Sequence, residues 1–202
     1  EKTWIHGFLF VLTVLTACVA GLGWSASFLS FGSAGAPGPD LAAVAGQVFR
    51  DPRLFPLSAL HAAALMTILA GHELGHYLTC RRYGIRATLP YFLPGPPFLG
   101  TFGAFIRIKS PISFRRQVFD VGANGPLAGF ALALPVLIAG LAFSRVAPFT
   151  PSPDTISFGE PLLFRLLSSL FFGPLPEGSA VVLHPVGFAG WVGLLVTALN
   201  LV

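Results

Sequence analysis

The chain has 202 residues, of which 54% are hydrophobic and only 10% charged, with a mean hydropathy of +0.77 and a formal net charge of +4. Soluble domains carry about a quarter charged residues, so this composition excludes an ordinary water-soluble fold. The apolar residues are grouped into runs of about 20, the length that crosses a hydrocarbon core about 30 Å thick. We therefore predict an α-helical polytopic membrane protein that contacts the lipid bilayer.

Hydropathy predicts four spanning helices, at residues 4–24, 55–80, 119–146 and 180–202. Together they are expected to form a single membrane-embedded domain over residues 1–202. The chain starts at Glu1 rather than Met and stops inside the last apolar run, so we expect it to be part of a longer polypeptide. Nothing in the sequence predicts an oligomeric state.

The loop between the second and third predicted spans, residues 81–118, holds seven of the twelve basic residues. By the positive-inside rule this loop is predicted to be cytoplasmic, and we expect the membrane to be the plasma membrane. The positive net charge is thus an orientation signal. Since the basic residues flank helix ends, we expect no nucleic-acid partner.

The same loop has a period-2 pattern, in which Ala104, Ile106 and Ile108 alternate with Arg107 and Lys109. This alternation is typical of a half-exposed strand. The preceding residues 93–97, Leu-Pro-Gly-Pro-Pro, predict a turn. We expect a short hairpin or small sheet that lies at the membrane surface or dips into it.

The second predicted span contains the motif His-Glu-Leu-Gly-His at residues 72–76. On a helix, four-residue spacing places His72 and His76 on one face about one turn apart, where both can bind the same zinc ion. Glu73 lies within reach of a metal-bound water and can act as its general base. Ionisable groups at membrane depth are costly and usually functional, which favours a catalytic zinc site.

Catalytic zinc normally takes three protein ligands, so the two histidines are an incomplete set. His61 precedes His72 by eleven residues and would lie about 16 Å away along the helix, too far to share an ion. The other candidates lie near span ends or in loops, and no spacing distinguishes one of them: Asp120, for which we expect a helix N-cap role, Asp154, Glu160, Glu177 and His184.

Three segments resemble the site-2 protease family of intramembrane metalloproteases, peptidase family M50. They are residues 70–77 (Ala-Gly-His-Glu-Leu-Gly-His-Tyr), 100–105 (Gly-Thr-Phe-Gly-Ala-Phe) and 125–129 (Gly-Pro-Leu-Ala-Gly). The resemblance covers about residues 55–202. It implies that His72 and His76 bind Zn²⁺ and that Glu73 activates water. It also implies that the protein cuts a peptide bond in or near the transmembrane segment of a substrate, close to the cytoplasmic side.

In that family the third ligand is an aspartate of an Asn-x-x-Pro-x-x-x-Leu-Asp-Gly motif, whose first residue resembles Asn200. The aspartate would follow Asn200 by about eight residues, so the resemblance implies that the chain stops before it at Val202. Activity of this chain alone is therefore left open. Asn200 itself would orient the substrate carbonyl or stabilise its oxyanion.

The strand around Gly103 and Phe105 could hold an unwound substrate in extended form by β-augmentation. The alternative is a hairpin that only plugs or anchors the helix bundle. Gly125 and Gly129 are expected to let two helices pack closely. For the whole protein, the alternative to a protease is an inactive relative that binds membrane segments as a scaffold. A transporter is disfavoured because the only acidic residue within the predicted spans' apolar interior is Glu73.

Overall fold

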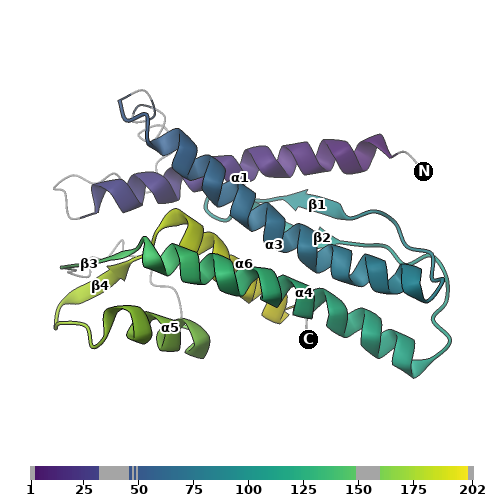
Figure 1. Cartoon of the computed structure of the whole chain (residues 1–202). Coiled ribbons are helices and arrows are strands. Elements are labelled where there is room, and N and C mark those ends of the chain that lie inside the picture. The colour runs from purple at the N-terminus through teal and green to yellow at the C-terminus, as the bar shows by residue number, and fades with distance from the viewer. Residues whose placement is uncertain (1–2, 32–45, 47, 49, 149–159, 200–202) are drawn as a thin grey trace.

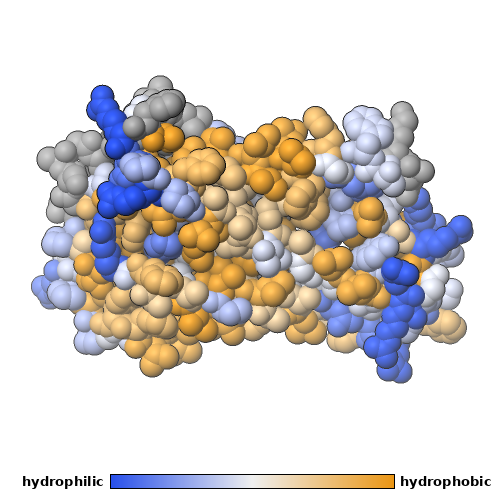
Figure 2. Space-filling view, turned by 45° about the horizontal axis from the view of Figure 1, so that its top comes forward, coloured by the Kyte–Doolittle hydropathy of each residue, from blue (hydrophilic) through white to orange (hydrophobic). Residues whose placement is uncertain are grey.

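The computed structural model describes residues 3–31, 46, 48, 50–148 and 160–199. Three of its helices are long and apolar enough to cross a membrane: α1 (Trp4–Ser30), α3 (Leu54–Arg82) and α4 (Arg115–Ala142). They extend along the long direction of the molecule (Figure 1). The face of the molecule shown in Figure 2 is apolar in the middle and hydrophilic toward both ends, as expected for a protein embedded in a bilayer. Three of the four predicted spans therefore correspond to candidate membrane-spanning helices.

The fourth predicted span, residues 180–202, is not helical over its whole length. Its first residues belong to strand β4 (Ser179–Val182), and helix α6 covers Pro185–Leu199. These 15 residues are fewer than the roughly 20 that cross a bilayer, and residues 200–202 lie outside the described part. Hydropathy placed the start too early because it does not distinguish an apolar strand from an apolar helix.

Two other predicted spans have the right centre but different ends. The span predicted at 4–24 continues to Ser30, whose hydroxyl donates to the carbonyl of Ala26 at 2.6 Å. The span predicted at 119–146 begins earlier, with Arg115 and Arg116 in its first turn. Basic side chains at a helix end reach into water, so hydropathy omitted this turn. It ends at Ala142, because strand β3 (Arg145–Pro148) follows.

The predicted hairpin after the second span is present. Strand β1 (Tyr91–Pro94) pairs antiparallel with β2 (Thr101–Phe105), and one isolated bridge, Ala87 to Ile108, extends the pairing. Strand β2 therefore ends at Phe105, before the residues 106–109 in which most of the predicted alternation lies. A second hairpin-like pair, β3 with β4, and the short helix α5 (Leu162–Phe172) were not predicted.

The β1–β2 hairpin lies along α1. Three side chains of α1 contact hairpin carbonyls: His6 Nδ1 to Pro90 (3.1 Å), Thr16 Oγ1 to Gly100 (2.6 Å) and Trp24 Nε1 to Phe98 (2.9 Å). His6 and Trp24 are separated by about 27 Å of helix, most of a hydrocarbon core about 30 Å thick. Irregular backbone is tolerated at that depth only where protein groups satisfy it, and α1 supplies them.

Helix α3 lies at the centre of the bundle, where it packs against α1, α4 and α6. Its fully buried Leu65 and Ile68 belong to the same core as Leu137 of α4. The α4–α6 contact is close: a Cβ added to Gly140 would lie only 2.1 Å from the Cα of Gly187. This backbone contact fixes α6 against α4, beside the helix that carries the histidines.

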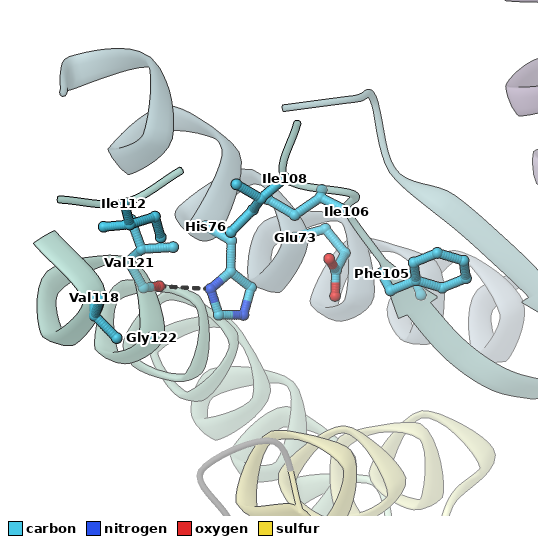
Figure 3. A pocket seen from close by; sticks show the side chains of 10 residues that line it. Glu73, His76, Phe105, Ile106, Ile108, Ile112, Val118, Val121 and Gly122 are labelled. Atoms are coloured by element: carbon cyan, nitrogen blue, oxygen red, sulfur yellow. Dashed lines mark hydrogen bonds between the residues drawn. The ribbon is translucent and has the colours of Figure 1, made fainter. Parts of the chain in front are cut away.

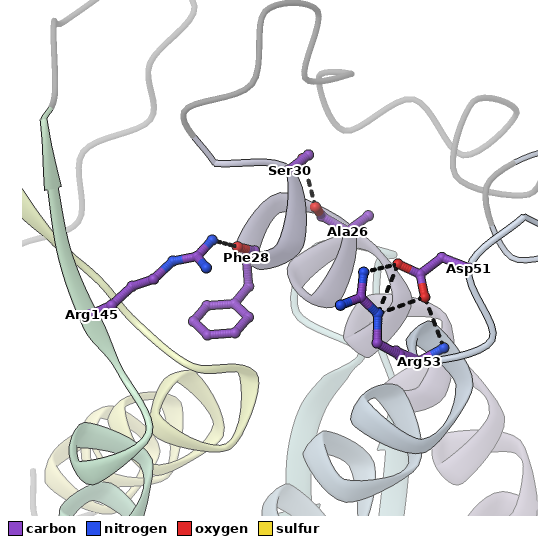
Figure 4. Close-up of polar contacts among 6 residues, drawn as sticks. All are labelled: Ala26, Phe28, Ser30, Asp51, Arg53 and Arg145. Carbon is purple, nitrogen blue, oxygen red and sulfur yellow. Dashed lines mark hydrogen bonds and ion pairs between the residues drawn. The ribbon is translucent and has the colours of Figure 1, made fainter.

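Polar contacts hold the end of the bundle near β3 (Figure 4). The Arg145 guanidinium donates to the carbonyl of Phe28 at 2.5 Å and lies 4.9 Å from the centre of the Phe28 ring. Just before α3, Arg53 forms an ion pair with Asp51 at 2.7 Å, and these hydrogen bonds lower the pKa of the Asp51 carboxyl. Arg145 thereby joins β3 to the last turns of α1.

Candidate metal centre

Helix α3 presents both predicted metal ligands with their rings turned toward each other. The Nε2 atoms of His72 and His76 are 3.2 Å apart. The other ring nitrogen of His76, Nδ1, lies 2.6 Å from the carbonyl oxygen of Val121 on α4. A carbonyl only accepts, so Nδ1 carries the proton and Nε2 keeps a free lone pair. His76 is thus held in the tautomer that a metal ligand needs.

The spacing of the two Nε2 atoms fits a zinc ion. Nitrogens bound at 2.0–2.1 Å to a tetrahedral ion lie about 3.3 Å from each other, close to the observed 3.2 Å. Among the described residues no group of three His, Cys, Asp or Glu side chains could hold a metal. The described part of the chain therefore contains two of the predicted ligands, His72 and His76. Asn200, which was expected to begin the motif of the third, lies outside it.

Glu73 stands beside an open cavity of about 340 Å³ (Figure 3). Its side chain is only 4% exposed, and the backbone of Ile106 lies within hydrogen-bonding range of its carboxylate. His76 lines the same cavity. The remaining walls are mainly apolar and come from the segment after β1 and from α4: Ala104, Phe105, Ile106, Ile108, Ile112, Val118, Val121 and Gly122. Glu73, the predicted base, and His76, a predicted metal ligand, thus face one space large enough for part of a peptide chain.

The two predicted substrate-binding residues differ in their position. Phe105 lines the cavity, whereas Gly103 does not belong to its lining. Gly103 has φ +101°, a conformation that favours glycine, and its amide donates to the Thr101 hydroxyl at 2.9 Å. Gly103 therefore shapes the strand, while Phe105 is placed where a ligand could touch it.

Two glycines of α4 make room for the imidazole rings. A Cβ added to Gly125 would lie 2.1 Å from Nε2 of His76, and one added to Gly129 would lie 2.8 Å from Nδ1 of His72. The sequence predicted these glycines as packing residues only. Their contact with both ligands could not be inferred from the sequence, because it depends on how α4 crosses α3.

The other histidines and Asp120 have structural contacts. The Nδ1 atom of the buried His61 lies 2.8 Å from the Pro185 carbonyl, which agrees with its exclusion as a ligand. His184 accepts from the amide of Val186 at 3.2 Å, and burial lowers the pKa of His184. The expected N-cap role of Asp120 is wrong, since Asp120 lies inside α4 and accepts a hydrogen bond from Tyr83. That hydrogen bond raises the pKa of Tyr83.

A family model described as peptidase family M50 matches residues 60–202. The chain belongs to this family. The matched region begins in α3 and contains the histidines, Glu73, both glycines and the β1–β2 hairpin. This membership confirms the family that the three sequence segments indicated.

Curated relatives agree with the family. The chain is 37% identical over 147 residues to the probable zinc metalloprotease EGY2, chloroplastic, of Arabidopsis thaliana, covering 68% of this chain and 25% of that protein. It is 34% identical over 153 residues to the probable zinc metalloprotease EGY1, chloroplastic, of Oryza sativa subsp. japonica, covering 73% and 26%. The chain spans about a quarter of the length of these relatives. No solved structure matches it significantly.

These relatives are named as zinc metalloproteases, which agrees with the predicted activity and metal. They do not support the predicted plasma membrane, because the relatives are described as chloroplastic. What the structure itself supports is a multi-pass membrane protein with three candidate spans in the described residues.

Proposed function

We propose that this chain forms the catalytic core of a zinc metalloprotease that cuts a peptide bond in or near a transmembrane segment of another membrane protein. The observation that carries the proposal is the 3.2 Å approach of two Nε2 atoms inside a helix long enough to cross a bilayer. Glu73 next to a cavity supplies the third element of such a site. A soluble zinc protease would have no need of this setting.

The residues of the chain have distinct tasks in this proposal. His72 and His76 would hold Zn²⁺, which supplies Lewis-acid polarisation of a carbonyl and acidification of water when bound. The Glu73 carboxylate removes the proton of the attacking water and then passes it to the leaving amine nitrogen. The walls of the cavity are mainly apolar, and a low-dielectric surrounding strengthens the charge interactions of Glu73.

We further propose that the substrate lies in extended form beside β2 and the residues that follow it. Arg107 accepts from the Thr88 amide at 2.9 Å and Lys109 donates to Arg86 at 2.7 Å. Because strand residues alternate, the backbone groups of Ile106 face the other way, toward Glu73. A substrate strand could pair with this edge, with Phe105 packing against its side chains.

Asn200 is proposed to orient the substrate carbonyl or to stabilise the oxyanion. For the two basic ends of the predicted loop 81–118, residues 81–86 and 107–116, we propose the cytoplasmic side, because seven of the twelve basic residues lie there. Cleavage would then occur near that side. No particular membrane is proposed.

The test uses the full-length protein in detergent and in proteoliposomes with a single-span model substrate. Wild type should contain zinc near one per chain and cleave. Glu73→Gln should keep zinc and lose cleavage by at least about 10²-fold, since proton transfer is removed. His72→Ala should lose both, and Glu177→Gln, an exposed carboxylate, should lose neither.

Three results would overturn the proposal. Cleavage by Glu73→Gln at the wild-type rate would remove Glu73 from the chemistry. Zinc content that does not depend on His72 would remove the metal centre, and zinc-free protein that still binds the substrate would establish the scaffold alternative.

A further inference from the structure

The two histidine ligands differ in what holds their second ring nitrogen. Nδ1 of His76 donates to the Val121 carbonyl at 2.6 Å. Nδ1 of His72 is buried and has no hydrogen-bond partner in the described structure. Metal-binding histidines almost always donate their other N–H to an oxygen acceptor, which fixes the tautomer and the ring orientation. His72 therefore lacks an acceptor that its role requires.

A second buried polar atom without a partner lies close to it. The hydroxyl of Thr197 on α6 is 4% exposed as a residue and makes no hydrogen bond in the described structure. A Cβ added to Gly129 would lie 2.7 Å from Thr197 Oγ1 and 2.8 Å from His72 Nδ1. The two atoms are thus at most about 5.5 Å apart, over the same glycine. A hydrogen bond between them would require the Thr197 hydroxyl to turn toward Nδ1 while the His72 ring keeps its place.

Thr197 also differs from other buried threonines of the bundle. Thr13 donates to the carbonyl of Leu9 at 2.8 Å, and Thr79 donates to that of Gly75 at 2.8 Å. Both hydroxyls are thereby satisfied within their own helix, four residues back. The hydroxyl of Thr197 is directed toward Gly129 and His72. In the described structure the Thr197 hydroxyl therefore makes no hydrogen bond to the backbone of α6.

We propose that Thr197 is the positioning residue of His72: its hydroxyl oxygen accepts the Nδ1–H of His72. This bond would hold the His72 tautomer whose Nε2 lone pair faces the metal, as the Val121 carbonyl does for His76. It would satisfy both buried polar atoms at once. It would also fasten α6 to the metal-binding turn of α3. The inference rests on the zinc site proposed above.

The test measures zinc affinity by competition with a chelator, in the full-length detergent-solubilised protein. Two matched pairs isolate the hydroxyl: Thr197→Ser against Thr197→Ala, and wild type against the isosteric Thr197→Val. We expect the Ala and Val variants to bind zinc about 10- to 100-fold more weakly, and the Ser variant to stay within about 3-fold of wild type. Thr13→Val, which removes a remote buried hydroxyl, should leave zinc affinity unchanged.

A second readout separates positioning from general destabilisation. The visible absorption of the Co²⁺-substituted protein reports ligand geometry, and it should change in Thr197→Ala but not in Thr197→Ser or Thr13→Val. Wild-type zinc affinity in both Thr197→Ala and Thr197→Val would overturn the inference. So would an equal loss in Thr197→Ser. If wild type bound no zinc, or His72→Ala bound it equally, the failure would lie in the proposed metal centre instead.

Discussion

The metal centre and the β1–β2 hairpin meet at Glu73, yet different kinds of contact hold them in place. At the metal centre, the imidazoles of His72 and His76 lie against α4 where Gly129 and Gly125 have no side chain. Along the hairpin, α1 side chains donate hydrogen bonds to backbone carbonyls. The metal centre depends on the space that the two glycines leave for the imidazole rings. The hairpin depends on hydrogen-bond donors that α1 supplies along its length.

This difference predicts which substitutions damage each region. An added methyl group should be most harmful at the metal centre, because helices and rings already touch there. A lost donor should be most harmful at the hairpin, because lipid offers its carbonyls no replacement. The two regions should also be separable, with zinc affinity reporting on the first and substrate cleavage on both.

The largest effect is expected from adding a methyl group beside the ligands. In Gly125→Ala the new Cβ would lie 2.1 Å from His76 Nε2, so ring or helix must move. Overpacking of this kind costs about 1–3 kcal/mol or more. We expect zinc affinity to fall by about 10- to 100-fold, measured by chelator competition. Gly122→Ala is the control, because nothing lies within 4 Å of its Cβ. Equal zinc binding by both variants would contradict the comparison.

A smaller effect is expected from the same change in the hairpin. Gly100 has φ +81°, and a Cβ there would lie 2.6 Å from the Cα of Ala17. Gly100→Ala should move the hairpin away from α1, so that cleavage falls by roughly 10-fold while zinc content stays near wild type. Gly84→Ala is the control: Gly84 has a similar φ of +67°, but nothing lies within 4 Å of an added Cβ. This variant therefore introduces backbone strain without a steric clash. A loss of zinc in Gly100→Ala would show that the two regions are not separable.

The same division explains what could be predicted from the sequence. The placement of His72, Glu73 and His76 follows from helix periodicity within five residues, so local geometry determines it. The contacts of Gly125 and Gly129 with the rings depend on a helix crossing, which no spacing specifies. The sequence indicated that a helix packs closely at Gly125 and Gly129, but not that the space is occupied by the two imidazole rings.

The part played by α1 was not predictable at all. Its contacts with the hairpin, such as Thr16 to Gly100, join residues 84 positions apart. In the sequence, Thr16 and Trp24 are surrounded by apolar residues, as lipid-facing residues are. Their role as hydrogen-bond donors becomes visible only in the folded structure, where the hairpin lies beside α1. The misplaced start of the last predicted span has a related cause, since pairing with β3 turns the apolar residues of β4 into a strand.

The smallest effect is expected from removing one donor while keeping the bulk of its side chain. The Trp24 indole N–H donates to the Phe98 carbonyl at 2.9 Å, and the centroids of the Trp24 and Phe188 rings are 3.9 Å apart. Trp24→Phe keeps an aromatic ring and removes the indole N–H, so it should destabilise the protein by about 1 kcal/mol. Thermal unfolding in detergent measures this loss, and protease access to the hairpin should rise with it. Zinc affinity should not change, because the lost hydrogen bond belongs to the hairpin alone; a weaker zinc site in this variant would mean that α1 supports both regions.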